Sequence, residues 1–188
     1  LQSTNQNLLT LGRDIGYIGV LIDDLVTKGT TEPYRMFTSR AEHRLLFNHA
    51  SSELRYLNIN DDFSLLSESR KSNIKAKSQQ ILEWVSLLTT EKAQGNDSHA
   101  DQIRKNQPND RLPKDFHLLT SEIKDEIFYR IKYDGYLQRE QRNVRKLRES
   151  EKIKIPHDFS YVNIPGLKTE CAEKLTMVKP ETLGQASR

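Results

Sequence analysis

Residues 120–148, TSEIKDEIFYRIKYDGYLQREQRNVRKLR, decide the fold class that the sequence predicts. Apolar side chains recur in this stretch with the period of an amphipathic α-helix. They are Ile123, Ile127, Ile131, Leu137, Val144 and Leu147. Thr120 is placed to cap the helix. The negative charge of Glu122 is favourable in the first turn, at the positive end of the helix dipole. We therefore predict one helix over 120–148, with Gly135 as a weak point because glycine costs about 1 kcal/mol relative to alanine.

Two segments before this stretch have the same helical period. Residues 11–29, LGRDIGYIGVLIDDLVTKG, place one apolar face on a helix that ends near Gly29. That face comprises Ile15, Ile18, Leu21, Ile22 and Leu25. Residues 63–92 are predicted to form another helix, whose buried stripe consists of Ile74, Ile81, Leu82, Val85 and Leu88.

Two further features complete the predicted organisation. Ser39 and Glu42 have the spacing of a capping box, which predicts a helix that begins near Ser39. Residues 93–113 are polar with little periodicity, which is typical of a long connection. No segment alternates apolar and polar residues as a strand would, and no repeat is present. We predict an all-α, helical bundle-like fold.

Composition limits the classes of protein to which the chain could belong. Of its 188 residues 35% are hydrophobic and 29% are charged, as in a rather polar globular protein. No run approaches the roughly 18 apolar residues of a membrane helix. A single cysteine, Cys171, excludes an internal disulfide. The net charge of +3 permits contact with nucleic acid without requiring it.

Neither a metal site nor a nucleotide-binding turn is predicted. The five histidines lack metal-ligand spacing, and no cysteine pair accompanies them. Gly12, Gly16 and Gly19 approximate the rhythm of a nucleotide-binding loop, but no strand precedes them, so close helix packing explains them better. Asp23 and Asp24 point about 100° apart on a helix and cannot share one proton. We expect them either to face solvent or to pair with arginines.

The strongest functional feature is a run of positive charge. Between residues 130 and 154 the chain has nine basic and four acidic residues, an excess of five positive charges. Arg139, Arg142, Arg145 and Lys146 share one helical face, which could track the phosphates of a nucleic acid. The tyrosines that could stack on a base are Tyr129, Tyr133 and Tyr136. The alternative, a solvated basic face beside core tyrosines, stays open.

A Pro-Gly turn precedes the last predicted helix. Residues 163–175, NIPGLKTECAEKL, resemble a helix-hairpin-helix element, in which backbone N–H groups after a glycine turn contact a phosphate. A plain interhelical turn, with Leu167, Ala172 and Leu175 packed inward, explains the same residues. Both interpretations stay open.

Four segments together resemble the GidA/MnmG family. Residues 17–46, YIGVLIDDLVTKGTTEPYRMFTSRAEHRLL, are similar to a long and distinctive block of that family. IKYDGYLQREQ (131–141), IPGLKTECAEKL (164–175) and KPETLGQASR (179–188) resemble three further family segments in the same order. The region between 61 and 119 shows much less resemblance.

The resemblance implies a function in tRNA modification. Family members act with a GTPase partner, MnmE, on carbon 5 of the wobble uridine of tRNA, and they use FAD, NADH and a folate-derived methylene donor. Their cofactor-binding fold and catalytic cysteines lie in the N-terminal portion, and Cys171 matches neither cysteine. We therefore expect no catalytic, cofactor-binding or metal-binding residue in this chain. The expected location is the cytoplasm, away from membranes, with a homodimer contact outside this chain.

The same resemblance suggests domains and sites. Residues 1–32 would be the terminal helix of the flavin domain, 33–119 a first helical subdomain with the polar connection at 93–113, and 120–188 a C-terminal helical subdomain truncated at its end. The predicted tRNA contacts are Tyr136, Arg139, Arg142, Arg145 and Lys146. The residues expected to contact either tRNA or the flavin domain are Arg35, Arg40 and Arg44. The residues expected to bind MnmE are Gly166, Leu167, Lys168 and Lys174. A pure protein-interaction module without RNA contact is the alternative.

Overall fold

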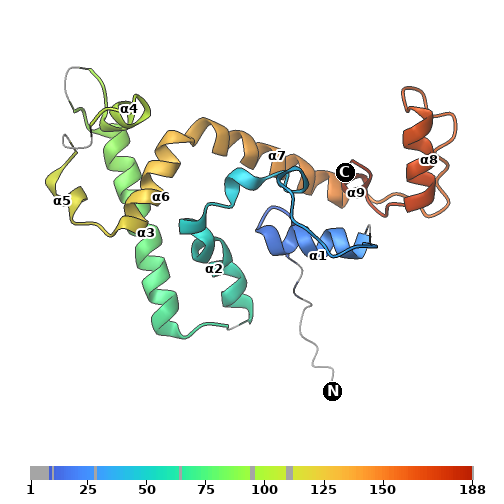
Figure 1. The fold of residues 1–188 in the computed structure, drawn as a ribbon, viewed down its shortest axis with the longest axis horizontal. Coiled ribbons are helices and arrows are strands. Elements are labelled where there is room, and N and C mark those ends of the chain that lie inside the picture. The colour runs from blue at the N-terminus through green and yellow to red at the C-terminus, as the bar shows by residue number, and fades with distance from the viewer. Residues whose placement is uncertain are drawn as a thin grey trace. The chain divides into compact units, whose positions relative to one another are not determined.

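The computed structural model describes residues 9, 11–27, 29–63, 65–93, 96–108 and 112–187, without the side chains at 58 and 60–62. The α-helices in these residues are α1 (Tyr17–Thr27), α2 (Ser52–Phe63), α3 (Glu68–Thr90), α4 (His99–Arg104), α5 (Lys114–His117), α6 (Ser121–Lys132), α7 (Asp134–Lys152), α8 (Thr169–Val178) and α9 (Leu183–Ala186) (Figure 1). Within the described residues, β-pairing is limited to two isolated bridges, Lys92–Ser98 and Lys154–Thr182. The all-α prediction is confirmed.

The chain forms two compact units, Leu1–Gln138 and Arg139–Arg188. Their boundary falls within α7 and inside the subdomain predicted over 120–188. The sequence-based limits at 32 and 119 stay predictions.

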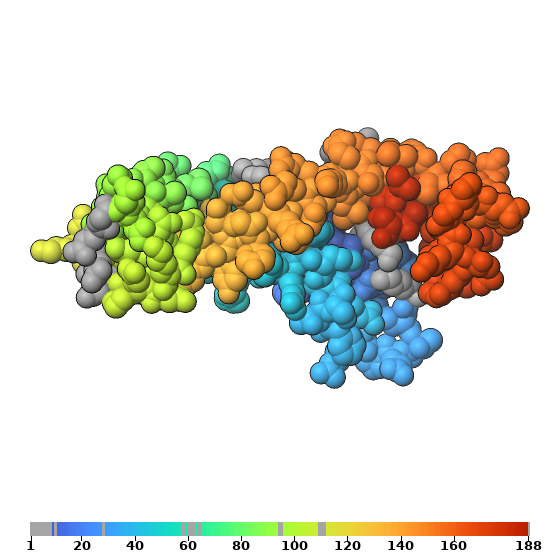
Figure 2. All heavy atoms as spheres, turned by 90° about the horizontal axis from the view of Figure 1, so that it is seen from above, coloured from blue at the N-terminus to red at the C-terminus, as the bar shows by residue number. Residues whose placement is uncertain are grey.

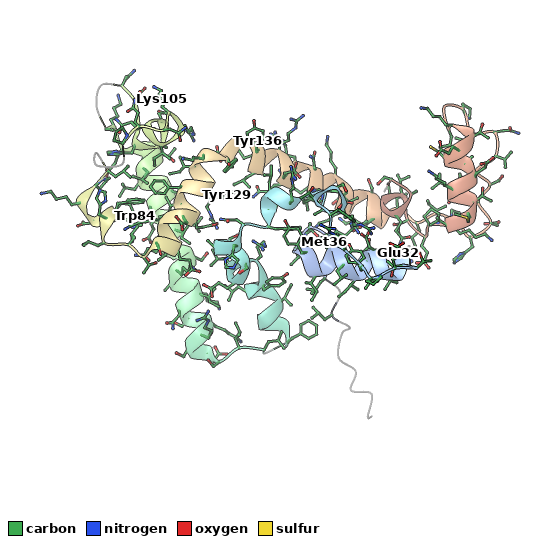
Figure 3. The ribbon with its side chains drawn as sticks, in the orientation of Figure 1. Glu32, Met36, Trp84, Lys105, Tyr129 and Tyr136 are labelled. Atoms are coloured by element: carbon green, nitrogen blue, oxygen red, sulfur yellow. The ribbon has the colours of Figure 1, made fainter. Side chains whose placement is uncertain are left out.

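The main core of the first unit lies among α3, α4, α5 and α6. Its largest fully buried side chains include Phe116, Ile81, Leu88, Ile127 and Ile131. Trp84 of α3, which Figure 3 labels, and Phe128 of α6 meet the Phe116 ring edge-on, at centroid distances of 5.5 and 5.4 Å. Such aromatic pairs contribute about 0.5–1.5 kcal/mol beyond their buried area.

The predicted stripe of α3 is largely correct. Ile74, Ile81 and Leu88 are buried and seven residues apart, so they return to the same face after two turns. Val85 is half-buried. Leu82 is 51% exposed, so its place in the stripe was predicted wrongly. It directly follows Ile81 and therefore points about 100° away from the buried face.

The sequence predicts that the polar segment 93–113 is a long connection. The structure corrects this prediction, because the segment contains the helix α4. The Ser98 hydroxyl accepts a hydrogen bond from the Asp101 amide, and the Asp101 carboxylate accepts one from the Ser98 amide. This capping box begins a helix whose Ala100 and Ile103 enter the main core. One short turn with two apolar residues is too brief to show helical periodicity in a sequence.

No α-helix begins near Ser39, which corrects the second predicted helix. The residues there form 3₁₀ turns, η1 (Thr38–Arg40), η2 (Arg44–Leu46) and η3 (His49–Ser51), and α2 follows. The Glu42 carboxylate bonds to the guanidinium of Arg13, at 2.9 and 3.2 Å, instead of capping a helix. A long-range ion pair has replaced the local capping box.

Helix α1 buries a different face from the predicted one. Gly19, Val20 and Asp24 are buried, whereas Ile18 and Ile22 are 48% and 47% exposed. Val20 packs with Ala41 and Phe47 in a second, smaller core. The buried face combines a small, an apolar and a charged residue, and hydrophobic spacing alone cannot identify such a face.

The predicted helix over 120–148 is two helices, α6 and α7, separated at Tyr133. Thr120 stands at the N-cap of α6, but its side chain makes no capping hydrogen bond. At the other end of α6, the Ile131 carbonyl accepts a hydrogen bond from the Arg104 guanidinium at 3.3 Å. Gly135 lies in the first turn of α7 and is not the break itself.

The second unit holds its last helices together through short backbone contacts. The amide of Ile155 donates to the Glu181 carbonyl, and the amide of Leu183 donates to the Ile153 carbonyl, both at 2.9 Å. Gly184 permits close approach to α7, because a Cβ there would lie 2.4 Å from the Glu151 side chain and 3.1 Å from its backbone. α9 is thereby held against the end of α7.

Candidate nucleic-acid interface

The basic stripe, Arg139, Arg142, Arg145 and Lys146, lies on α7 in the second unit, and all four residues are exposed. Val144 is buried on the opposite side of the helix. With about 100° per residue, the four basic positions fall within about a third of the helix circumference. The structure therefore brings these predicted residues together on the solvent side of one helix.

The charges of the stripe are not neutralised by ion pairs. No hydrogen bond or ion pair joins the four side chains to another group in the described part of the chain. Glu149, an acidic neighbour on the same helix, pairs with Lys152 at 2.7 Å instead. Each cation of the stripe is therefore available to a phosphate.

Tyr136 belongs to the first unit, so the predicted tRNA-contact set is divided between the two units. The Tyr136 ring is 60% exposed, and its centroid lies 6.5 Å from that of Tyr133. Tyr129 on α6 has a structural role, because its hydroxyl donates to the Leu45 carbonyl at 2.5 Å (Figure 3). Burial raises the pKa of Tyr129 above its ordinary value. Tyr136 is thus the more accessible candidate for stacking.

The three arginines of the 3₁₀ segment have different surroundings. Arg40 is anchored, since its guanidinium lies 3.4 Å from the Asp24 carboxylate and its carbonyl accepts from Arg13 at 2.7 Å. Arg35 and Arg44 are exposed. The Arg35 guanidinium lies over the Phe37 ring, 5.2 Å from its centroid. Arg35 and Arg44 can therefore reach an outside partner, whereas Arg40 also braces the fold.

Sequence reasoning missed Arg13, which is only 5% exposed and is the centre of an ionic cluster. Its guanidinium bonds to the carboxylates of Asp23, Asp24 and Glu42 at 2.8–3.2 Å. Burial opposes the charge, but these hydrogen bonds outweigh it and raise the pKa of Arg13 above its ordinary value. The acidic pair Asp23 and Asp24 therefore braces arginines. Only the acids, and not Arg13, stand out in the sequence.

The Pro-Gly turn has the backbone geometry that such a turn requires. Gly166 has φ +84°, a conformation that favours glycine, and the Leu167 amide donates to the Ile164 carbonyl at 3.1 Å. Lys168 and Lys174 are exposed, and Lys174 pairs with Glu170 at 2.7 Å. The hydrogen bond of this pair raises the pKa of Lys174. These residues form an accessible turn and helix face.

The glycines near α1 pack closely against other protein atoms, as the sequence predicted. A Cβ on Gly16 would lie 2.2 Å from the Tyr56 hydroxyl, and one on Gly19 would lie 2.2 Å from the Gly12 carbonyl oxygen. Gly16 and Gly19 therefore allow a close approach between parts of the protein that a larger side chain would prevent. In the second unit, a pocket of about 100 Å³ next to Phe159 is smaller than the roughly 300 Å³ of a typical ligand site.

Two kinds of feature are absent from the described residues. They contain no group of three or more histidine, cysteine, aspartate or glutamate side chains arranged to hold a metal ion. Among them, no helix combines the length and the apolar character needed to cross a membrane.

Comparisons with known proteins agree on one family. Residues 143–188 match the model of the tRNA modifying enzyme MnmG/GidA C-terminal helical bundle. The whole chain is 38% identical to the tRNA uridine 5-carboxymethylaminomethyl modification enzyme MnmG of Borrelia garinii subsp. bavariensis, over 33% of that protein. It is also 38% identical to the same enzyme of Aquifex aeolicus, over 32% of its length. The chain thus spans about a third of the curated relatives that it matches.

Solved structures show the same likeness. Aquifex aeolicus GidA in the form I crystal matches 95% of this chain with 39% identity and a TM-score of 0.70, over 30% of its own length. The form II crystal matches 96% of this chain with 38% identity and a TM-score of 0.72, over 31% of its length. Both the helical fold and the sequence are therefore similar to GidA.

Proposed function

Because the chain belongs to the MnmG/GidA family, as a C-terminal helical part of its members, we propose that it supplies tRNA binding and partner docking to an enzyme that modifies wobble uridine at carbon 5. The observation that carries the RNA-binding part is the basic stripe of α7. Four exposed cations on one helical face, which form no ion pair with the described residues, match the requirement for contacts with successive phosphates.

The stripe extends over about 10 Å of helix axis, given a rise of about 1.5 Å per residue. If each of its four cations neutralises one phosphate, tRNA affinity should fall with salt at a slope of about −3 in log–log form. That slope corresponds to a loss of roughly 50-fold or more between 50 and 200 mM salt. A contact without phosphates would show a much smaller dependence.

The test compares tRNA binding by two double variants across this range of salt. Arg139→Ala with Arg142→Ala should weaken binding and reduce the slope by about two. The matched control is Arg70→Ala with Lys105→Ala, which removes the same charge from exposed residues that pair with Glu53 and Asp97. Equal affinity and equal slope for the two variants would contradict the proposal.

For docking of the GTPase MnmE, we propose the turn and helix face formed by Gly166, Leu167, Lys168 and Lys174. The support is their exposure, or half-burial for Leu167, together with the fixed left-handed turn at Gly166. FAD and NADH would bind in the portion of the full-length enzyme outside this chain, and the homodimer contact would also lie there. A tRNA-modifying enzyme works where its substrate is, so we place it in the cytoplasm.

A pure protein-interaction module is the second candidate. The observation that favours it is the apolar surface of α8, where Met177 and Val178 are 79% and 59% exposed. In that case the basic stripe would be only solvated. The chain would then bind MnmE with little salt dependence and would not bind tRNA at any salt concentration.

A further inference from the structure

Guanidinium groups and aromatic rings alternate on the segment that follows α1 and ends with η1. The Arg35 guanidinium lies over the Phe37 ring at 5.2 Å, and the Arg40 guanidinium lies 5.8 Å from the same ring. Arg40 also lies over the Tyr34 ring at 4.9 Å. We name these four residues the arginine–aromatic ladder. Such contacts between cations and ring faces are favourable and orient the guanidinium relative to the ring.

The inner end of the ladder is fixed to the fold. The Tyr34 hydroxyl donates to the Asp24 carboxylate at 2.9 Å, and Arg40 reaches the same carboxylate at 3.4 Å. Asp24 is fully buried and also bonds to Arg13. Tyr34 and Arg40 therefore connect the ladder to the buried ionic cluster around Asp24.

The outer end of the ladder is open to solvent. Phe37 is 47% exposed and Arg35 is exposed, on a stretch of the surface that Figure 2 shows in light blue. No carboxylate in the described residues pairs with Arg35. A cation without an acidic partner, held against an exposed ring, presents both a planar stacking face and free donors.

We propose that the arginine–aromatic ladder stacks an unpaired base of RNA, with the planar guanidinium of Arg35 and the Phe37 ring as the contact surface. The inference rests on the proposed tRNA binding and adds to it a second contact, of a different physical kind from the phosphate contacts of α7. Proteins recognise single-stranded RNA by stacking splayed bases on aromatic rings and arginine planes. A purely electrostatic contact would need neither the ring nor the plane.

Two conservative variants separate stacking from charge. Arg35→Lys retains the positive charge but loses the planar group, and Phe37→Leu retains an apolar side chain but loses the ring. Matched controls are Arg70→Lys, another exposed arginine, and Phe159→Leu, a residue that is also 47% exposed and whose ring packs against Tyr161. Circular dichroism of each variant establishes that the fold is retained.

The experiment measures binding of an unmodified tRNA to the 188-residue chain, together with the fluorescence of anticodon stem–loops that carry 2-aminopurine at each unpaired position in turn. The unsubstituted chain should quench one position by stacking. Arg35→Lys and Phe37→Leu should abolish that quenching and weaken binding about five-fold or more, while the controls do neither. Phe37→Leu should leave the salt slope unchanged, because stacking releases no counterions.

Two outcomes would overturn the inference, and they differ in what they say about the proposed function. If tRNA binding depends on Arg139 and Arg142 but Arg35→Lys and Phe37→Leu behave like their controls, only the ladder proposal fails. If the unsubstituted chain binds no tRNA, both proposals fail.

Discussion

The guanidinium of Arg13 donates a 2.8 Å hydrogen bond to Asp24, whose carboxylate is fully buried. This pair ties the residues before α1 to the helix, and the additional bonds from Arg13 to Glu42 and to the Arg40 carbonyl bring in the 3₁₀ segment. The cluster thus holds in place the part of the first unit that carries Arg35, Arg40 and Arg44.

Replacing Arg13 with methionine should destabilise the chain by about 3 kcal/mol, because it leaves buried carboxylate charge only partly compensated. This loss of stability lies at the low end of the roughly 3–5 kcal/mol expected for breaking a buried ion pair, because Asp24 keeps its contacts with Arg40 and Tyr34. Urea unfolding measures the change. Arg70→Met is the control, because it breaks an exposed pair worth at most about 1 kcal/mol. Equal losses in the two variants would contradict the structural role assigned to Arg13.

Two glycines should respond to alanine in opposite directions. A Cβ on Gly19 would lie 2.2 Å from the Gly12 carbonyl oxygen, so Gly19→Ala should cost about 1–3 kcal/mol through forced backbone displacement. A Cβ on Gly135 meets nothing within 4 Å, and Gly135→Ala should stabilise α7 by about 0.5–1 kcal/mol. Thermal unfolding should show Tm falling for the first variant and rising for the second. An unchanged or raised Tm for Gly19→Ala would contradict the packing assigned to Gly19, and a lowered Tm for Gly135→Ala would contradict the open surroundings of Gly135.

The capping prediction compares Ser98 with Thr120. Ser98→Ala should cost about 1 kcal/mol, because the hydroxyl accepts from the Asp101 amide and completes the capping box of α4. Thr120→Ala should lower the free energy of unfolding by only about 0.3 kcal/mol, since the Thr120 side chain makes no capping hydrogen bond. Urea unfolding of the two variants checks the difference. A larger loss for Thr120→Ala would reverse the assignment.

These two caps illustrate what the sequence could and could not predict. The periodic stripes of α3 and α6 were readable, because Ile81, Leu88 and Ile127 follow the helical period and pack in one core. The turn at Gly166 could also be predicted, because the positive φ that favours glycine there is a local property of the backbone. Whether a threonine or a serine actually caps depends on the side-chain rotamer and on tertiary packing.

The misplaced elements share a different cause, which is competition from distant residues. Glu42 has capping-box spacing from Ser39, but its carboxylate bonds to Arg13, 29 positions earlier in the chain. Helix α1 turns Val20 and Asp24 inward because that same arginine requires a buried acid. Interactions between residues far apart in sequence leave no periodic trace in a single sequence, so neither the ionic cluster nor the arginine–aromatic ladder could be predicted from it.

A carboxylate between two helices should make stability depend on pH. Glu53 of α2 accepts from Lys77 of α3 at 2.8 Å, and this hydrogen bond lowers the pKa of Glu53 below its ordinary value of 4.5, although burial opposes the shift. A depressed pKa contributes stability above the unfolded value, and that stability is lost as pH falls through the folded value. Glu53→Gln should therefore lower the free energy of unfolding by about 0.5–1 kcal/mol at pH 7.

The difference between Glu53→Gln and the parent should shrink as the pH falls below 4.5, since the parent then loses the same charge by protonation. Urea unfolding at several pH values between 7 and 3 measures it. A difference that grows toward acid pH would have the wrong sign and would contradict the ion pair.

The tRNA and MnmE surfaces proposed on the second unit should separate under mutation. Lys168→Glu with Lys174→Glu changes exposed residues at the Pro-Gly turn and on α8, so it should weaken MnmE binding several-fold and leave tRNA affinity nearly unchanged. Arg139→Ala with Arg142→Ala should do the reverse, because phosphate contacts dominate RNA affinity. Titrations of both variants with both ligands, at one salt concentration, test the assignment. If either double variant lowered the affinity for tRNA and the affinity for MnmE by the same factor, the two ligands would share one surface, and the proposal of two separate surfaces would be wrong.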